Sequence, residues 1–296
     1  MNLDSILLHY SSQTQIPTNG VIPCCLSLDC IAISALTIAD TRLVHNVLFD
    51  IDPTEAFAKV ARPPWALAPR AVLQPGENFR FAIPPTGSES RALMCEEFNV
   101  LFEEAVKMLS ACGGSLVEDM DYTIFEDAGR LLYEGSFVAE RVSGVREWYD
   151  AHPAPAPGSD EKDVLLPEIR TIYDAAAKNF TAVDAWSDAL KMMQCQRRAN
   201  AEFTEKNVQV LIVPTVPLHP TKEAYRKDPI GLNHRLGKVC ICDLKFGGSA
   251  DVLGLVYALR QYLGYDGRFD PCRIHVGGHA VCYHSAWAEF YRRDGA

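Results

Sequence analysis

The sequence predicts an α/β fold, with a mixed β-sheet flanked by helices, and three observations lead to it. Residues 208–213 are apolar apart from Gln209 and stop at Pro214, as expected of a strand that is buried on both faces. Residues 96–111 have the apolar spacing of an amphipathic helix. Gly113-Gly114 then ends that helix and a short strand begins at Ser115, which makes a helix–strand unit typical of α/β proteins.

Helical spacing also extends over three longer stretches. Residues 31–49 show it, and Thr37-Ile38-Ala39-Asp40 forms a capping-box pattern, with Asp in the usual Glu position, that predicts a helix start at about Ala39. Residues 126–148 are expected to form one continuous helix. A long helix is expected over 183–206, with Thr181 as its N-cap.

The composition is that of a globular protein. The chain has 296 residues, of which 48% are hydrophobic and 22% are charged, so it is long enough to bury a large core. Its formal net charge of -10 argues against a nucleic-acid partner, because phosphate backbones are bound by clustered Lys and Arg. The same charge argues against docking on an anionic membrane.

Targeting and redox signals are weak. Residues 1–10 lack the basic start and apolar run of a signal peptide, and the apolar stretch 30–38 is too short to cross a bilayer, so a cytoplasmic protein is expected. The ten irregularly spaced cysteines fit free thiols better than a disulfide framework. Cys24, Cys25 and Cys30 are expected to be small buried side chains.

Three groups of residues carry a resemblance to a known family. The first comprises Asn19-Gly20-Val21-Ile22-Pro23, Ser27-Leu28-Asp29 and Thr37-Ile38-Ala39-Asp40. The second comprises Leu131-Leu132-Tyr133-Glu134-Gly135 and Ala139-Glu140-Arg141. The third comprises Leu211-Ile212-Val213-Pro214-Thr215, Asp228-Pro229-Ile230-Gly231-Leu232-Asn233 and Arg235-Leu236-Gly237. In this order they resemble the amidase-signature family, and the second and third resemble its allophanate hydrolase branch.

The resemblance covers about residues 15–240 and is weak over 243–296. The family has one α/β domain built on a large mixed sheet. The resemblance therefore implies that residues 1–296 form a single partial amidase-signature domain, similar to the C-terminal two thirds of the family's domain and truncated at the N-terminus.

The resemblance also assigns a substrate-binding pair. Allophanate hydrolases bind the substrate's carboxylate with a Tyr and an Arg eight residues apart, and Tyr133 and Arg141 match them. A guanidinium offers a planar fork to a carboxylate and a phenol adds a directed donor. Spacing alone equally allows a core aromatic at Tyr133 and an ion pair between Arg141 and either Glu134 or Glu140.

The family's catalytic residues have no match in this sequence. Amidase-signature enzymes use a Lys, a bridging Ser and a nucleophilic Ser, all upstream of the first matched group. The first lysine here is Lys59, Ser11-Ser12 replaces a different turn of the family pattern, and Gly247-Gly248-Ser249 is at the wrong end of the chain. No catalytic residue is therefore assigned, and the N-terminal catalytic part is expected to be missing.

Signals for metal or cofactor binding are weak in the sequence. Cys272, His275, His279 and Cys282 have a spacing that permits zinc binding. The surrounding Ile274, Val276 and Gly277 resemble the family's last strand instead, so no metal is predicted. No phosphate-binding glycine loop is present in the sequence, so no cofactor is predicted either.

Two functions remain open from the sequence. The first is hydrolysis of a small carboxylated urea or amide, with the chain as written inactive alone. The second is a non-catalytic remnant that binds a small carboxylate or associates with a full-length amidase. Loss of strands from the middle of a sheet leaves apolar edges, so self-association is also expected.

Overall fold

The computed structural model describes residues 7–10, 16–29, 31–35, 38–50, 52–56, 78–214, 216–237 and 251–254. In these residues the main sheet has four parallel strands in the order β4-β3-β5-β6. They are β3 (Phe79–Ala82), β4 (Gly114–Val117), β5 (Val210–Val213) and β6 (Asp251–Gly254). A separate antiparallel pair consists of β1 (Leu7–Tyr10) and β2 (Ala32–Ala35). The predicted α/β fold class is confirmed.

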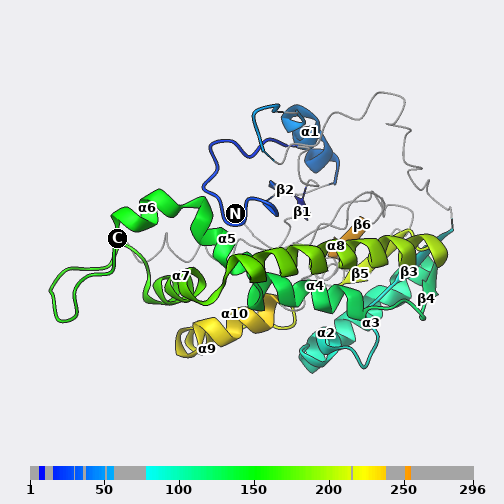
Figure 1. Cartoon of the computed structure of the whole chain (residues 1–296). Helices are drawn as coiled ribbons and strands as arrows, with labels where there is room; N and C mark the ends of the chain where they lie inside the picture. Colours follow the sequence, from blue (N-terminus) through cyan, green and yellow to red (C-terminus); the bar gives the residue numbers. More distant parts are fainter. Residues whose placement is uncertain are drawn as a thin grey trace.

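The described helices fall into two groups (Figure 1). The shorter ones are α2 (Glu89–Ala92), α5 (Phe137–Gly144), α6 (Arg146–Ala151), α9 (Lys222–Lys227) and α10 (Pro229–Gly237). The longer ones are α1 (Ile38–Leu48), α3 (Glu96–Ala111), α4 (Thr123–Glu134), α7 (Pro167–Asn179) and α8 (Ala182–Glu205). In the part of the chain that the structure describes, no helix is long and apolar enough to cross a membrane.

Strand β5 lies at the centre of the core because all four of its residues are buried. Leu211 and Val213 pack with side chains of α4 and α8, while Val210 and Ile212 pack with side chains of α3. Successive strand residues point to opposite faces of a sheet, so helices cover β5 on both sides. This burial on both faces explains why all four residues of β5 are apolar.

Several predicted elements are confirmed. Helix α3 has the predicted bounds, and α8 begins at Ala182 after the predicted cap. The Thr181 hydroxyl accepts a hydrogen bond from the Asp184 N–H at 3.3 Å, and the Asp184 carboxylate accepts one from the Thr181 N–H at 2.8 Å. This reciprocal pair is a capping box, which satisfies two otherwise unpaired donors at the helix start.

The predicted helix start at about Ala39 is confirmed to within one residue, because α1 begins at Ile38. The helical spacing from residue 31 was wrong for Ala32–Ala35, which is strand β2 and pairs with β1 in a register that sets Leu7 opposite Ala35. The predicted cap at Thr37 lies outside the described residues. A strand partner far away in the sequence overrode the local spacing.

The single helix predicted over 126–148 was also wrong. The structure divides this stretch into α4, α5 and α6, with breaks at Gly135–Ser136 and at Val145. Cys272, His275, His279 and Cys282, whose spacing permits a zinc site that was not predicted, lie outside the described residues, as does Gly247-Gly248-Ser249.

The cysteine predictions are confirmed in part. Cys24, Cys25, Cys95, Cys112 and Cys195 are free thiols. Cys25 is buried as expected, whereas Cys24 is exposed, so the prediction for Cys24 was wrong. Cys30 lies outside the described residues. The buried Cys25 thiol contacts α5 through the Phe137 carbonyl and the Glu140 carboxylate.

Candidate substrate-binding site

Arg141 lies half-buried on α5, a helix that packs against α4 and α7. The site around it includes Tyr173 on α7, which the sequence reading did not single out. Burial raises the pKa of the Tyr173 phenol, the neighbouring Cys24 thiol raises it further, and the positive charge of Arg141 lowers it in part. Arg141, Cys24 and Tyr173 therefore lie near enough for the charges of Arg141 and Cys24 to affect the Tyr173 phenol.

The first family group forms a tight turn beside α5. The Asp29 carboxylate accepts hydrogen bonds from the N–H groups of Cys24 and Cys25, each at 2.9 Å. The backbone N–H groups of Leu28 and Asp29 both donate to the Cys25 carbonyl at 2.7 Å. An Asp side chain that binds preceding N–H groups stabilises a turn without regular secondary structure.

Glu140 joins this turn to the helix that carries Arg141. Its Oε1 accepts a hydrogen bond from the Ser27 N–H at 2.6 Å, and its Oε2 accepts one from the Ser27 hydroxyl at 2.7 Å. The Cys25 thiol donates to the same Oε2 at 2.9 Å. Three donors from one turn converge on one carboxylate, so the first and second family groups are held together.

The Cys25 thiol is unsuited to act as a nucleophile. Burial raises its pKa far above the ordinary range, and the hydrogen bond to Glu140 and the negative charge of Glu140 raise it further. A thiol attacks as the thiolate, and this environment keeps the proton on sulfur. Cys25 is therefore a donor that packs the turn.

Gly144 brings the turn close to the end of α5. A Cβ at this position would lie 2.9 Å from Cγ of Pro23 and 3.0 Å from its Cβ. Such contacts are shorter than packed carbons allow, so the Pro23 ring can lie this close to the α5 backbone only because residue 144 has no side chain.

Tyr133 lies in the last turn of α4, on the other side of a break from Arg141. Asp188 of α8 holds this break, because its Oδ2 accepts a hydrogen bond from the Ser136 N–H at 2.9 Å. A Cβ on Gly135 would lie 2.6 Å from the Leu131 carbonyl oxygen. The eight-residue spacing therefore spans two consecutive helices that pack together, rather than two turns of one helix.

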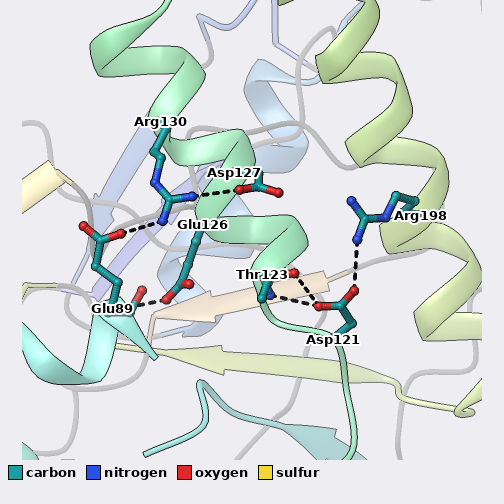
Figure 2. A network of polar contacts seen from close by, with 8 residues as sticks. Glu89, Asp121, Thr123, Glu126, Asp127, Arg130 and Arg198 are labelled. Atoms are coloured by element: carbon teal, nitrogen blue, oxygen red, sulfur yellow. Dashed lines mark hydrogen bonds and ion pairs between the residues drawn. The ribbon is translucent and has the colours of Figure 1, made fainter. Parts of the chain in front are cut away.

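Helix α4 is fixed from both sides by ion pairs, as Figure 2 shows. Arg130 donates to Glu89 of α2 and to Asp127, both at 2.7 Å. Asp121, just before α4, accepts from Arg198 of α8 at 3.0 Å and from the Thr123 hydroxyl at 2.6 Å. Such exposed pairs are individually weak, but together they set the position of the helix that carries Tyr133.

The third family group lies in β5 and α10. Asp228 accepts a hydrogen bond from the Gly231 N–H at 2.9 Å, which caps the start of α10. The guanidinium of Arg235 donates to the Leu93 carbonyl at 2.9 Å. These hydrogen bonds stabilise α10, which packs against α4, so the group has a structural role beside that helix.

A large hollow lies elsewhere, between α4 and α8. It has a volume of about 510 Å³ and is lined by Asp127, Leu131, Lys191, Gln194, Cys195, Arg197 and Arg198. Arg141 does not line it. The assignment of Arg141 as a binding residue therefore depends on the matched sequence and its neighbours, and not on the size of a cavity.

Comparisons with known proteins agree with this arrangement. The family model described as Amidase matches residues 10–241. The urea amidolyase of Saccharomyces cerevisiae is 31% identical over 221 residues, which are 74% of this chain and 11% of that protein. Because the model matches most of the chain, the chain belongs to the Amidase family.

Two solved structures are similar in fold and sequence. The selenomethionine-substituted allophanate hydrolase of Kluyveromyces lactis superposes with a TM-score of 0.64 at 28% identity, covering 81% of this chain and 36% of that one. The urea amidolyase of K. lactis superposes with a TM-score of 0.65 at 27% identity, covering 82% of this chain and 14% of that one. The chain thus spans only a small part of the relatives it matches.

Proposed function

We propose that this chain forms the carboxylate-recognition part of an allophanate-hydrolase-like active site, with Tyr133 and Arg141 as its substrate-binding residues. The observation that carries the proposal is the junction at α5. There the Glu140 carboxylate accepts hydrogen bonds from Ser27, which join the turn to the helix that carries Arg141. Two separate family groups therefore meet at the residue expected to bind the substrate.

The chemistry of this junction suits a small acid. Arg141 is half-buried and its Nε is buried, so a carboxylate that reaches the guanidinium meets less competing water than at an open surface. Each hydrogen bond between charged partners contributes roughly 1.5–3 kcal/mol net. One such bond is enough to favour a carboxylated urea over a neutral amide of the same shape.

The proposed substrate is therefore allophanate or a similar small carboxylated amide. The relatives named urea amidolyase and allophanate hydrolase support this choice. The family reaction needs a Lys and two Ser residues, for which the 296 residues have no match. We accordingly propose that these 296 residues bind the acid but do not hydrolyse it by themselves, and that they reside in the cytoplasm.

Calorimetric titration of the 296-residue chain with allophanate and with biuret tests the recognition. Biuret has a neutral amide where allophanate has its carboxylate. We expect allophanate to bind more tightly, and Arg141→Gln to weaken allophanate binding by about 10- to 100-fold with little effect on biuret. Equal binding of the two ligands would overturn the proposal.

Arg146→Gln is the matched control for this experiment. Arg146 is an exposed arginine on the next helix, where it pairs with Asp150 at 2.6 Å. Its replacement removes the same charge and should leave allophanate affinity unchanged within twofold. A similar loss in both variants would mean that net charge, and not a built site, attracts the ligand.

Ammonia release separates the two functional alternatives. The chain alone, incubated with allophanate, should release no more ammonia than a buffer blank. Release above the blank that disappears in Arg141→Gln would show a catalytic protein and overturn the non-catalytic assignment. The second candidate function, association with a full-length amidase, predicts that adding this chain to such an enzyme changes its activity.

A further inference from the structure

The hollow between α4 and α8 is lined by both apolar and charged side chains. Leu131 and the buried Cys195 give it apolar surface. Its charged residues are one acid on α4, Asp127, and three bases on α8, Lys191, Arg197 and Arg198. The lining therefore has a net charge of +2, whereas the whole chain carries -10. Its volume of about 510 Å³ lies in the range of small-molecule sites.

Asp127 and Arg198 have opposite charges and lie on facing walls of this hollow without bonding to each other. Figure 2 shows their charged groups turned toward the space between α4 and α8. Asp127 instead accepts from Arg130 at 2.7 Å, and Arg198 donates to Asp121 at 3.0 Å. Burial raises the pKa of the Cys195 thiol, the charge of Asp127 raises it further and the charge of Arg198 lowers it, so both groups lie near that sulfur. A ligand with one cationic and one anionic group would bridge the two walls.

Helices α4 and α8 run antiparallel. Asp121, just before α4, pairs with Arg198 in the C-terminal half of α8. Ser136, just after α4, donates its N–H to Asp188 in the N-terminal half of α8. The lining residues of the two helices therefore follow one another in opposite directions along the hollow.

This arrangement places the charged groups in a definite order. Lys191 and Arg198 are seven residues apart on α8, so they lie about 10 Å apart along its axis. Cys195 lies between them on the same helix. On the facing helix, Asp127 lies nearer the Arg198 end and Leu131 nearer the Lys191 end. The order along the hollow is thus a base, an acid, apolar surface and a second base.

The bases keep N–H groups that a ligand can use. Arg198 donates to Asp121 through Nη2, which leaves the rest of its guanidinium fork. The Lys191 ammonium donates to Asp188 at 2.9 Å and has two further N–H groups. Arg197 has no ion-pair partner in the part of the chain that the structure describes. The hollow therefore has more donors than its own acids bind.

We propose that this hollow binds a free amino acid that carries a second acid group, of the glutamate type. The α-carboxylate accepts hydrogen bonds from Arg198, and the α-ammonium donates to Asp127. The methylene groups lie on Leu131 and Cys195, and the side-chain carboxylate accepts from Lys191. The groups of the ligand follow the same order as the residues that line the hollow. This site is separate from Arg141, which does not line the hollow.

Calorimetric titration of the 296-residue chain with three matched ligands tests the proposal. L-Glutamate carries all three charged groups, glutarate lacks the ammonium, and 4-aminobutyrate lacks the α-carboxylate. We expect glutamate to bind at least tenfold more tightly than either of the others, because each of them leaves Asp127 or Arg198 without its partner. Absence of glutamate binding at millimolar concentration, or equal affinity for glutamate and glutarate, would overturn the proposal.

Asp127→Asn gives a readout that a general loss of structure would not give. It should weaken glutamate binding at least tenfold, because the ammonium loses its partner, but strengthen glutarate binding, because a repelling carboxylate is removed. Glu205→Gln is the control, since it removes an exposed acid from α8 outside the hollow and should change neither affinity. Weakened binding of both ligands to Asp127→Asn would count against the bridging role.

Arg141→Gln separates this site from the proposed allophanate site. The substitution should leave glutamate affinity unchanged within twofold, and Asp127→Asn should likewise leave allophanate affinity unchanged. If Arg141→Gln weakens glutamate binding as strongly as Asp127→Asn does, glutamate occupies the Arg141 site and the inference of a second site is wrong. Failure of allophanate to bind leaves the glutamate result unaffected, so the two proposals fail separately.

Discussion

The Ser27 hydroxyl and the Glu140 carboxylate meet at 2.7 Å, although the two residues are 113 positions apart in the sequence. Ser27 also donates its backbone N–H to the other carboxylate oxygen at 2.6 Å. One acidic side chain thus fixes both the hydroxyl and the backbone of the turn. Because Arg141 follows Glu140 directly, this contact also fixes the position of the helix that carries Arg141 relative to the turn.

Replacing Glu140 by Ala should destabilise the protein by roughly 2–4 kcal/mol, because three donors at a partly buried site lose one acceptor. Urea denaturation followed by circular dichroism measures the change. Glu147→Ala, at an exposed acid on α6, is the matched control and should cost less than about 0.5 kcal/mol. Equal effects of the two substitutions would show that the Glu140 contacts contribute little.

Cys24 and Cys25 should differ sharply in their reaction with iodoacetamide. Cys24 is exposed, whereas burial and the bond to Glu140 raise the pKa of Cys25. At about pH 8 the Cys24 thiol should alkylate at least tenfold faster, because alkylation requires an accessible thiolate. Tandem mass spectrometry of the peptide distinguishes the adjacent residues.

The same labelling has an internal control in Glu140→Gln. Removing the carboxylate should speed alkylation of Cys25 and leave Cys24 unchanged, since two of the three leading causes that raise the Cys25 pKa come from Glu140. If the two cysteines react at similar rates in the parent chain, the turn is not packed against α5 in solution.

The elements that could be predicted from sequence are those whose signals are local. The signals for α3 and for the N-cap at Thr181 lie within a few helical turns of sequence, and both predictions were confirmed. The break at Gly135 could not be predicted in this way, because it depends on Asp188 from another helix. The strand at Ala32–Ala35 depends likewise on pairing with β1.

In the candidate site too, some features had a signal in the sequence and others depend on contacts between distant segments. Tyr133 and Arg141 could be named because a family pattern carries them, and the family itself is confirmed. Their role in binding stays a prediction. The anchoring contacts of Glu140 and the nearness of Tyr173 had no signal in the sequence, because both arise from packing between segments far apart along the chain.

Gly135→Ala should destabilise the protein by about 1–3 kcal/mol, because its new methyl group would overlap the Leu131 carbonyl and approach Asp188. The bend between α4 and α5 must then open, so allophanate affinity should fall as well. Gly87→Ala is the control, since a Cβ there meets no atom within 4 Å. Unchanged stability in Gly135→Ala would mean that the bend tolerates a side chain.

Asp163 and Arg170 should make stability depend on pH in the acid range. Arg170 donates to Asp163 through Nε at 2.8 Å and through Nη2 at 2.7 Å. The hydrogen bond from Arg170 is the main cause that lowers the pKa of Asp163 to about 2, and the Leu165 N–H lowers it further. The pair closes the loop that precedes α7, the helix that carries Tyr173.

A carboxyl whose pKa is lower in the folded state than in the unfolded state binds fewer protons when folded. Its contribution is therefore complete above the ordinary value of 3.8 and is lost as pH falls toward 2. Asp163→Asn should be less stable than the parent at neutral pH, and the difference should shrink below about pH 4. Asp160→Asn, an exposed acid in the same loop, should match the parent throughout. The urea midpoints of the parent and Asp163→Asn, measured from pH 2 to pH 7, test this prediction. A difference between the two midpoints that does not change with pH would show that packing, and not the ionised carboxylate, stabilises the loop.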